Sequence, residues 1–209
     1  MFKLTKINEY TYSLKINSKH SLQLYKLIKL FIKTSYINYQ TNIIQFSAES
    51  VSTLEQNFVL SYGNCIKLID DLTKQIFYLK EANYGFYGFD INDILKIDNN
   101  YLFCSAQYLL PLRNDDFIFY SPIKQPYFSS PEIHELTTLP STINHKCIYY
   151  SIGVLTTFCL LNTYLLVGNE IKTTKEIELI LKPLYGTKIY WFIKRCLEED
   201  INIRHLLLI

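Results

Sequence analysis

The side chains best suited to holding a metal ion are spread along the whole sequence. The five cysteines are Cys65, Cys104, Cys147, Cys159 and Cys196, and the four histidines are His20, His134, His145 and His205. A zinc site needs four converging ligands, which usually come in close sequence pairs, and this sequence has no Cys-x-x-Cys pair. We therefore expect no metal site, and we interpret the cysteines as buried, reduced thiols of an intracellular protein.

A second chemically distinctive stretch is Phe-Ser-Ser-Pro-Glu-Ile, residues 128–133. Its glutamate, Glu132, has two open interpretations. It is either a surface acid that favours the start of a helix, or a buried carboxylate. A buried carboxylate is costly unless it is paired and hydrogen-bonded, so the second interpretation requires a cationic partner much further along the chain.

Lysines and tyrosines also raise the question of nucleic-acid binding. Lys26, Lys29 and Lys33 lie on one face of a predicted helix, with tyrosines nearby. A solvated helix face explains these lysines equally well, and the formal net charge of +2 argues against strong phosphate binding. We expect no nucleic-acid partner. The sequence also lacks G-x-S-x-G, G-x-G-x-x-G, H-E-x-x-H and P-loop motifs.

The composition is that of a globular protein. The 209 residues are 49% hydrophobic and 15% aromatic, which is enough apolar material to build a core and argues against disorder. Charges within every window of the first sixteen residues exclude a signal peptide. Heavy use of Lys, Ile, Asn and Tyr, with little Gly, Met, Trp or Arg, indicates a coding bias typical of AT-rich genomes.

Local patterns predict a small α+β unit over residues 1–60. Residues 9–16 alternate in the manner of a β-strand, and residues 21–34 repeat apolar side chains at three- and four-residue steps, as an amphipathic helix does. Residues 36–51 contain two short strand-like runs joined by polar turn residues.

From residue 61 to residue 209 the pattern becomes mainly helical. Residues 64–85 carry one apolar stripe, made of Cys65, Leu68, Ile69, Leu72, Ile76 and Leu79. Charged residues, among them Asp70 and Asp71, are expected on the opposite, solvated face. Residues 93–106 then predict a β-hairpin that turns at residues 98–100, and a proline-containing loop follows.

Residues 147–169 form a run of twenty-three residues without a charge. This run is long enough to span a bilayer, but it contains several Ser, Thr and Asn side chains and little flanking basic charge. We favour a buried core helix, with a membrane span as the alternative. Two further helices, over residues 174–184 with a threonine cap and within residues 186–209, are expected to close the chain.

This order of elements, together with three short motifs, resembles the C-terminal lobe of protein kinases. The stretch Ser-Ser-Pro-Glu-Ile, with Pro131 and Glu132, is similar to the family's Ala-Pro-Glu motif. Tyr-Tyr-Ser-Ile-Gly-Val-Leu, with Ser151 and Gly153, is similar to the start of the family's wholly buried helix. Residues 195–204 are similar to the closing motif, which ends in an arginine, here Arg204.

The resemblance implies a protein kinase-like α+β fold. A reduced N-terminal lobe of a few strands and one helix would occupy residues 1–60, and a mainly helical C-terminal lobe would occupy residues 61–209. It also supplies the missing partner of Glu132, because the Pro-Glu glutamate of the family forms a buried ion pair with the closing arginine. The resemblance therefore implies a Glu132–Arg204 ion pair with an architectural role, in which the guanidinium can satisfy both carboxylate oxygens.

The residues that would carry kinase chemistry are missing. The family's His-Arg-Asp motif supplies the acid that orients the substrate hydroxyl, followed by a lysine two residues later and an asparagine five residues later. Aligned on Asp93-Ile-Leu, the resemblance places Gly88 at the acid, Asp90 at the lysine and Asp93 at the asparagine. Gly88 has no carboxylate. Asp93 remains a candidate metal ligand, and Asp90 is a substitute base only if the loop is shifted by two residues.

The other phosphate and metal positions are also empty of the expected residues. The Asp-Phe-Gly motif is expected near residues 103–108, which read Phe-Cys-Ser-Ala-Gln-Tyr and contain no acid. No glycine-rich loop covers a phosphate site, because the first glycine of the chain is Gly63. Lys15 is a candidate for the phosphate-binding lysine, but the helix over residues 21–34 offers it no glutamate.

The resemblance therefore implies a catalytically inactive kinase-like protein, a pseudokinase, similar to kinase-like proteins of large DNA viruses. We expect it to act as a binding or scaffold module with a protein partner, with weak or absent ATP and Mg²⁺ binding and no membrane contact. Its expected location is intracellular, in the host cytoplasm or the virion. Two alternatives remain: a divergent active Ser/Thr-type kinase that uses Asp90 and Asp93, and a membrane-anchored or virion structural protein.

Overall fold

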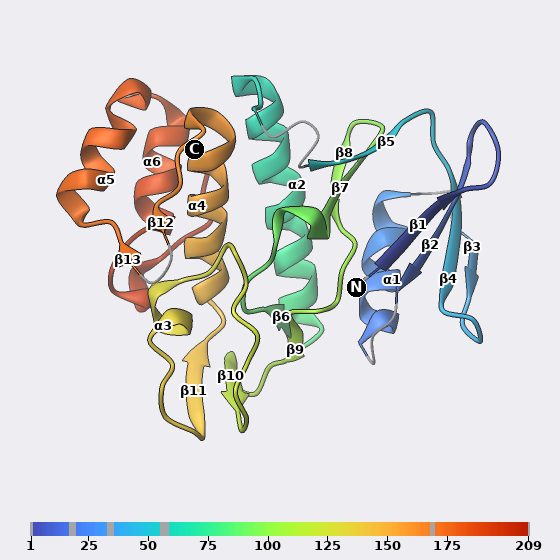
Figure 1. Ribbon diagram of the computed structural model, residues 1–209, viewed down its shortest axis with the longest axis horizontal. Coiled ribbons are helices and arrows are strands. Elements are labelled where there is room, and N and C mark those ends of the chain that lie inside the picture. Colours follow the sequence, from blue (N-terminus) through green and yellow to red (C-terminus); the bar gives the residue numbers. More distant parts are fainter. Residues whose placement is uncertain (1, 17–19, 33–35, 55–58, 168–169, 209) are drawn as a thin grey trace.

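The protein is a mixed α+β structure of several small antiparallel sheets and six α-helices among the residues described by a computed structural model, which are 2–16, 20–32, 36–54, 59–167 and 170–208. The α+β class expected from the sequence is confirmed. Figure 1 shows the first sheet at one end of the molecule, helix α2 in the middle, and helices α4, α5 and α6 at the other end.

The first sheet has the strand order β1-β2-β4-β3, with every neighbouring pair antiparallel. Its strands are β1 (Phe2–Lys6), β2 (Thr11–Ile16), β3 (Tyr36–Asn38) and β4 (Ile43–Ser47). The predicted strand and the two predicted short strands are thus confirmed as β2, β3 and β4, whereas β1 was not anticipated.

Helix α1 (Ser21–Phe31) confirms the predicted amphipathic helix, and the last two residues of that prediction lie outside the described part of the chain. Alternation along β2 buries Leu14 and Ile16 in the core. The hydroxyl of Tyr25 on α1 accepts a hydrogen bond from the backbone N–H of Ile16, at 3.4 Å, so the helix is tied to that strand.

Helix α2 (Tyr62–Glu81) begins after Ser61, whose side chain accepts a hydrogen bond from the backbone N–H of Asn64. The predicted apolar stripe is confirmed, since all six of its residues are buried. The placement of Asp71 on the solvated face was wrong. Asp71 is 2% exposed, and its buried carboxylate is compensated by a hydrogen bond from the backbone N–H of Tyr101 at 2.9 Å and by an ion pair with Lys67.

The predicted hairpin is formed by β7 (Ile94–Ile97) and β8 (Asn100–Phe103). Its turn places Asp98 at a φ of 52°, in the left-handed region that Asp and Asn tolerate better than most residues. A third strand, β5 (Val51–Thr53), pairs with β7. Strand β5 belongs to the predicted first unit, residues 1–60, but it pairs with a strand of the predicted second unit. The division of the chain at residue 60 stays a prediction.

Two further small sheets frame the loops that follow the hairpin. Strand β6 (Tyr84–Phe86) pairs with β9 (Leu109–Pro111), and β10 (Asp116–Phe119) pairs with β11 (Ser141–Asn144). Between β10 and β11 the chain forms a long loop that contains the single-turn helix α3 (Pro131–His134). Strands β12 (Leu166–Val167) and β13 (Glu170–Ile171) form a short pair after α4.

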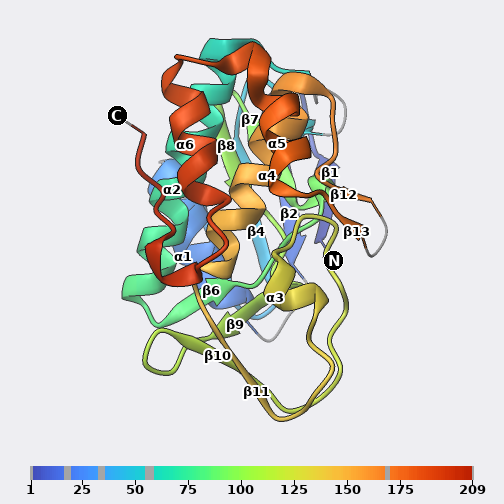
Figure 2. The same ribbon diagram turned by 90° about the vertical axis from the view of Figure 1, so that its left-hand side faces the viewer.

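Helix α4 (Cys147–Leu161) is the central helix of the second part and is buried on all sides for most of its length. It lies between α2 and the pair α5 (Thr174–Leu181) and α6 (Lys188–Cys196) (Figures 1 and 2). The expected core helix is confirmed, but it ends at Leu161 rather than continuing through residue 169, because Asn162 adopts a left-handed cap with a φ of 50°. Among the described residues, no helix is both long and apolar enough to cross a membrane.

Candidate functional site

The loop that follows β6 brings together the three positions at which the resemblance places kinase chemistry. Gly88 and Asp90 lead into the 3-10 turn η2 (Ile91–Asp93), and β7 begins directly afterwards. The carboxylate of Asp93 accepts a hydrogen bond from the backbone N–H of Asp90 at 2.8 Å. The carboxylate of Asp93 therefore stabilises the loop to which it belongs.

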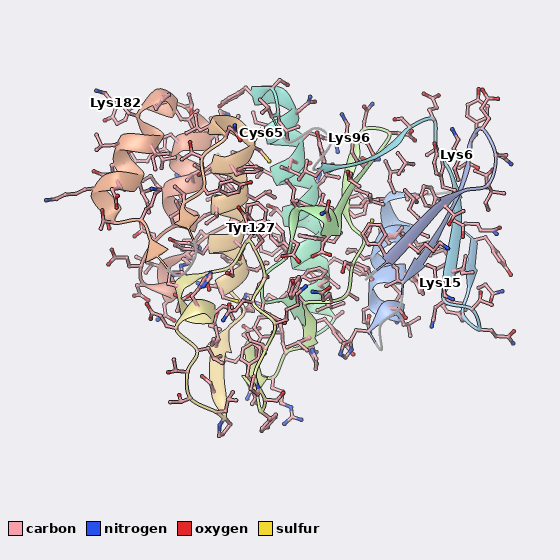
Figure 3. All side chains as sticks on the ribbon, viewed as in Figure 1. Lys6, Lys15, Cys65, Lys96, Tyr127 and Lys182 are labelled. Atoms are coloured by element: carbon pink, nitrogen blue, oxygen red, sulfur yellow. The ribbon has the colours of Figure 1, made fainter. Side chains whose placement is uncertain are left out.

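The carboxylate of Asp90 is held by donors from two other segments. Its Oδ2 accepts a hydrogen bond from the hydroxyl of Tyr108 at 2.6 Å, and its Oδ1 accepts one from the backbone N–H of Tyr127 at 2.7 Å. Lys124 lies 3.8 Å from Oδ2. Asp90 thus fastens the segment around residue 127 to the loop, and Tyr127 projects beside α4 in Figure 3.

Asp93 is nearly buried, and its environment disfavours charge. It is 8% exposed, and burial raises the pKa of its carboxyl, a rise that the hydrogen bond from Asp90 only partly opposes. Within the described residues, no group of three or more His, Cys, Asp or Glu side chains is arranged to hold a metal ion. Asp90 and Asp93 thus lie together in one loop, joined by the hydrogen bond between the Asp90 backbone and the Asp93 carboxylate.

Gly88 has no space for a side chain. A Cβ at this position would lie 2.2 Å from Cγ of Pro126 and 2.8 Å from the carbonyl oxygen of Phe128. The next residue, Phe89, exchanges two backbone hydrogen bonds with Phe128, of 3.1 and 2.9 Å. The segment 126–128 therefore occupies the volume that a catalytic carboxylate at residue 88 would need.

The segment that occupies the expected position of the Asp-Phe-Gly motif is also buried. Phe103, the last residue of β8, and Cys104 and Ser105 after it are buried, and the backbone N–H of Cys104 donates to the carbonyl oxygen of Asp93 at 2.8 Å. Burial raises the pKa of the Cys104 thiol well above its usual range. All five cysteines are buried and free, in line with the expectation for reduced thiols.

Lys15, the candidate phosphate-binding lysine, lies on the exposed face of strand β2. Its neighbours Leu14 and Ile16 are buried on the side of α1, so alternation directs Lys15 to the opposite, exposed face. There it lies opposite Lys3 of β1 in the antiparallel register, at the far end of the molecule from α4–α6 (Figure 3). The candidate role of Lys15 as a phosphate-binding lysine stays a prediction.

The structure brings Glu132 and Arg204 together in a two-pronged ion pair. Arg204 Nη2 lies 2.6 Å from Oε1 of Glu132, and Nη1 lies 3.1 Å from Oε2. Arg204 also donates to the carbonyl oxygens of Glu198 at 2.6 Å and Glu199 at 3.2 Å, and its guanidinium lies 5.0 Å above the centre of the Tyr150 ring. One buried cation thus fastens α3 to the chain after α6.

The electrostatics of this pair favour the charged form of the glutamate. Burial alone would raise the pKa of Glu132, but the hydrogen bonds and the charge of Arg204 outweigh it, and the pKa is lowered below its usual value. The side chain of Arg204 is fully buried, whereas that of Glu132 keeps 27% of its exposure. The alternative of an unpaired surface acid at a helix start was wrong.

The other motif residues have structural positions. Pro131 is the first residue of α3, where its missing N–H costs nothing. Ser151 is fully buried, and its hydroxyl lies 3.5 Å from the carbonyl oxygen of Cys147 one turn earlier. Gly153 allows α4 to approach α6 closely, because a Cβ there would lie 2.8 Å from Cβ of Cys196 and 3.0 Å from a methyl group of Leu197.

Sequence reasoning missed a second polar connection, between α2 and β8. Gln75 is completely buried, and its amide donates to the carbonyl oxygen of Tyr101 at 2.7 Å and accepts from the N–H of Phe103 at 2.9 Å. With Asp71 it satisfies the backbone of β8 on the side away from β7. The only sequence clue is that Gln75 and Asp71 are four residues apart, on the flank of the apolar stripe.

Comparison with known proteins adds no relatives. No protein-family model matches the chain, and no curated protein matches its sequence.

Proposed function

We propose that this chain is a catalytically inactive kinase-like protein, a pseudokinase, that acts by binding a protein partner. The observation that carries the proposal is the ion pair between Glu132 and Arg204. The kinase resemblance implies this pair from a Pro-Glu motif and a closing arginine 72 positions apart, and these two side chains meet with both oxygens and both terminal nitrogens engaged.

The order of elements gives the proposal further support. A long helix, α2, leads into the loop that carries Asp90 and Asp93, and the β7–β8 hairpin follows. After a long loop come α3 with its Pro-Glu, the buried helix α4, and then α5 and α6. The C-terminal lobe of protein kinases has its elements in the same order: a helix, a catalytic loop, a hairpin, a Pro-Glu motif and a buried helix. Likeness of fold alone does not establish an activity, so the state of the site residues decides the functional part.

The site supports a loss of phosphoryl transfer. Transfer requires positioned carboxylates for magnesium and for the attacking hydroxyl, and a cation on the phosphates. At the positions that the resemblance assigns, Gly88 is covered by Pro126, and Asp90 and Asp93 are engaged by backbone and tyrosine donors. Lys15 lies on the exposed face of its sheet, away from α1. The competing proposal of a divergent kinase would need Asp90 and Asp93 to leave these partners.

The first test is ligand binding together with phosphate transfer. The midpoint of thermal unfolding is measured with and without millimolar ATP, with Mg²⁺ or Mn²⁺, beside an active protein kinase as the positive control. A ligand at a hundredfold excess over its dissociation constant stabilises the native state by about 2.7 kcal/mol. We expect no rise in the midpoint and no transfer of labelled phosphate to a general protein substrate. A metal-dependent rise accompanied by transfer would overturn the proposal.

A pair of variants separates the two kinase readings if any transfer is seen. Asp90→Asn and Asp93→Asn abolish transfer if these carboxylates are catalytic. Under the present proposal they change only stability, because each carboxylate holds loop hydrogen bonds.

The proposed kinship with kinase-like proteins of large DNA viruses implies a location in the host cytoplasm or in the virion. Immunolocalisation of the protein in infected cells tests this location.

A further inference from the structure

A groove of about 710 Å³ lies where α3, α4, α5 and α6 meet. Figure 2 shows these helices from the side that is at the left in Figure 1. Its apolar lining comes from Tyr150 of α4, Ile177 of α5, Leu197 at the end of α6, and Ile203 in the 3-10 turn η4 (Ile201–Ile203). None of the residues from Gly88 to Asp93 line the groove.

The polar lining of the groove is predominantly acidic. Glu132 contributes to one wall, but Arg204 compensates its charge. Four other acids line the groove, namely Glu135, Glu198, Glu199 and Asp200. Glu135 directly follows α3, and the other three are consecutive residues shortly after the end of α6.

The two lysines of the lining offset little of this charge. Lys194 is already paired with Glu178 of α5, at 3.1 Å. Lys172 is then the one lysine of the lining whose positive charge can offset the negative charge of the four acids. Because no group of three or more ligating side chains converges among the described residues, the lining suits an extended organic cation better than a metal ion.

The buried ion pair fixes the backbone that presents these acids. Arg204 donates to the carbonyl oxygens of Glu198 and Glu199, so the backbone of both residues is held in place without use of their carboxylates. The carboxylate of Glu199 accepts a hydrogen bond from the hydroxyl of Thr174 at 2.9 Å, and that of Asp200 accepts from the N–H of Asn202 at 2.9 Å. A site whose backbone is fixed in advance loses less entropy when a ligand binds.

We propose that this groove binds a segment of a partner protein that carries an arginine or lysine beside an apolar residue. A long basic side chain has an apolar stem and a charged head, which match the apolar and the acidic residues of the lining. An arginine can also form two-pronged hydrogen bonds with a carboxylate. The inference rests on the proposed binding role and names its partner class, and it gives the architectural Glu132–Arg204 pair a consequence for recognition.

The test uses pools of octapeptides in which one central position is fixed as arginine, lysine, citrulline, leucine or glutamate and the others are randomised. Citrulline has the shape of arginine without its charge. Binding of each labelled pool to the full chain is measured by fluorescence anisotropy. We expect the arginine pool to bind at least about tenfold more tightly than the citrulline and glutamate pools, which corresponds to about 1.4 kcal/mol.

The matched variants localise the preference. Glu135→Gln/Glu198→Gln removes two groove charges, and the Arg204 contact with Glu198 survives because it uses the backbone oxygen. Glu9→Gln/Glu49→Gln removes the same charge from exposed positions in the first part of the chain. The arginine preference is expected to disappear in the groove variant and to persist in the control. Equal binding of all pools, or a preference that the groove variant retains, would overturn the inference.

The peptide experiment and the nucleotide experiment can each contradict one proposal without affecting the other. Phosphate transfer with an intact arginine preference would remove the inactive-kinase proposal and leave the groove. Absence of both transfer and preference would leave the pseudokinase proposal and remove the groove as the partner site.

Discussion

At the scale of single residues, the Glu132–Arg204 pair makes a sharp prediction about stability. The side chain of Arg204 is fully buried, so the change Glu132→Gln leaves an uncompensated guanidinium in the interior. We expect the free energy of unfolding to fall by about 3 kcal/mol, at the lower end of the range for broken buried pairs because Glu132 keeps some exposure. Unfolding in urea, followed by circular dichroism, measures the change.

The double variant Glu132→Gln/Arg204→Met is the control for this prediction. It removes both charges and keeps an apolar side chain of some length, so its loss of stability is expected to be smaller than the sum of the two single losses. Additive losses would mean that the two side chains do not stabilise one another.

A second residue-scale prediction concerns pH and His145. This side chain is 4% exposed, its Nδ1 lies 3.0 Å from the carbonyl oxygen of Asp115, and burial holds its pKa below the usual value. The folded protein therefore prefers the neutral ring. Its contribution to stability is complete above the unfolded pKa of about 6.5 and is lost as the pH falls toward the lower folded pKa.

The variant His145→Asn keeps an amide donor near Asp115 but does not titrate, so we expect a flatter loss of stability as the pH falls below about 6.5. The flattening is partial, because burial also lowers the pKa of His134. Unfolding free energies at several pH values give the slopes of the two proteins. An unchanged slope would show that His145 does not carry the effect.

At the scale of elements, the contact between α4 and α6 depends on Gly153. Alanine is the better helix former by about 1 kcal/mol, yet a Cβ at this position would overlap the side chains of Cys196 and Leu197. We expect Gly153→Ala to lower stability by about 1–3 kcal/mol, as overpacking of a core does. Thermal unfolding detects the loss.

Gly63 provides the matched control, because it lies in the first turn of α2 with nothing within 4 Å of an added Cβ. Gly63→Ala is expected to be neutral or to stabilise by up to about 1 kcal/mol. If both substitutions stabilise the protein, α4 and α6 can separate at little cost.

Elements with a strong local pattern were predictable from the sequence. The apolar stripe of α2, the alternation in β2 and the charge-free run that begins at Cys147 each identify an element without knowledge of its neighbours. The end of α4 was missed because it is set by one residue, Asn162, in a left-handed conformation that the uncharged run conceals.

Polar contacts between distant segments were less accessible. The Glu132–Arg204 pair was anticipated only through the resemblance to kinases, since no periodicity connects the two residues. Nothing local indicates that Asp71 and Gln75 turn inward to bind the backbone of β8, or that Pro126 fills the space above Gly88. In each case the partner is a backbone group or a loop whose position depends on the whole fold.

At the scale of the whole molecule, the two predicted parts share one core. Buried apolar residues form a continuous cluster from Tyr12 to Leu206, and β5 pairs with β7. The carboxylate of Asp98 in the hairpin turn also accepts hydrogen bonds from the backbone N–H groups of Glu49 and Ser50, at 2.8 and 2.9 Å. The two parts are therefore connected by packing, strand pairing and hydrogen bonds.

We expect residues 1–60 and 61–209 to unfold in a single transition, because separation would expose the shared core. Trp191, the only tryptophan, reports on α6, and backbone amide NMR signals of β2 and β4 report on the first sheet. Both probes are followed through the same urea titration. Two separated midpoints would establish independent domains.

The distance along the chain between Glu132 and Arg204 also has a kinetic consequence. The pair closes a loop of 72 residues, and closing such a loop costs about 4 kcal/mol of chain entropy. Local helices and hairpins form before a contact of this kind, so we expect the pair to be absent from the folding transition state. Glu132→Gln would then accelerate unfolding by roughly 100-fold and leave the folding rate near that of the wild type. The ion pair would set the lifetime of the native state and have little influence on how quickly that state is reached.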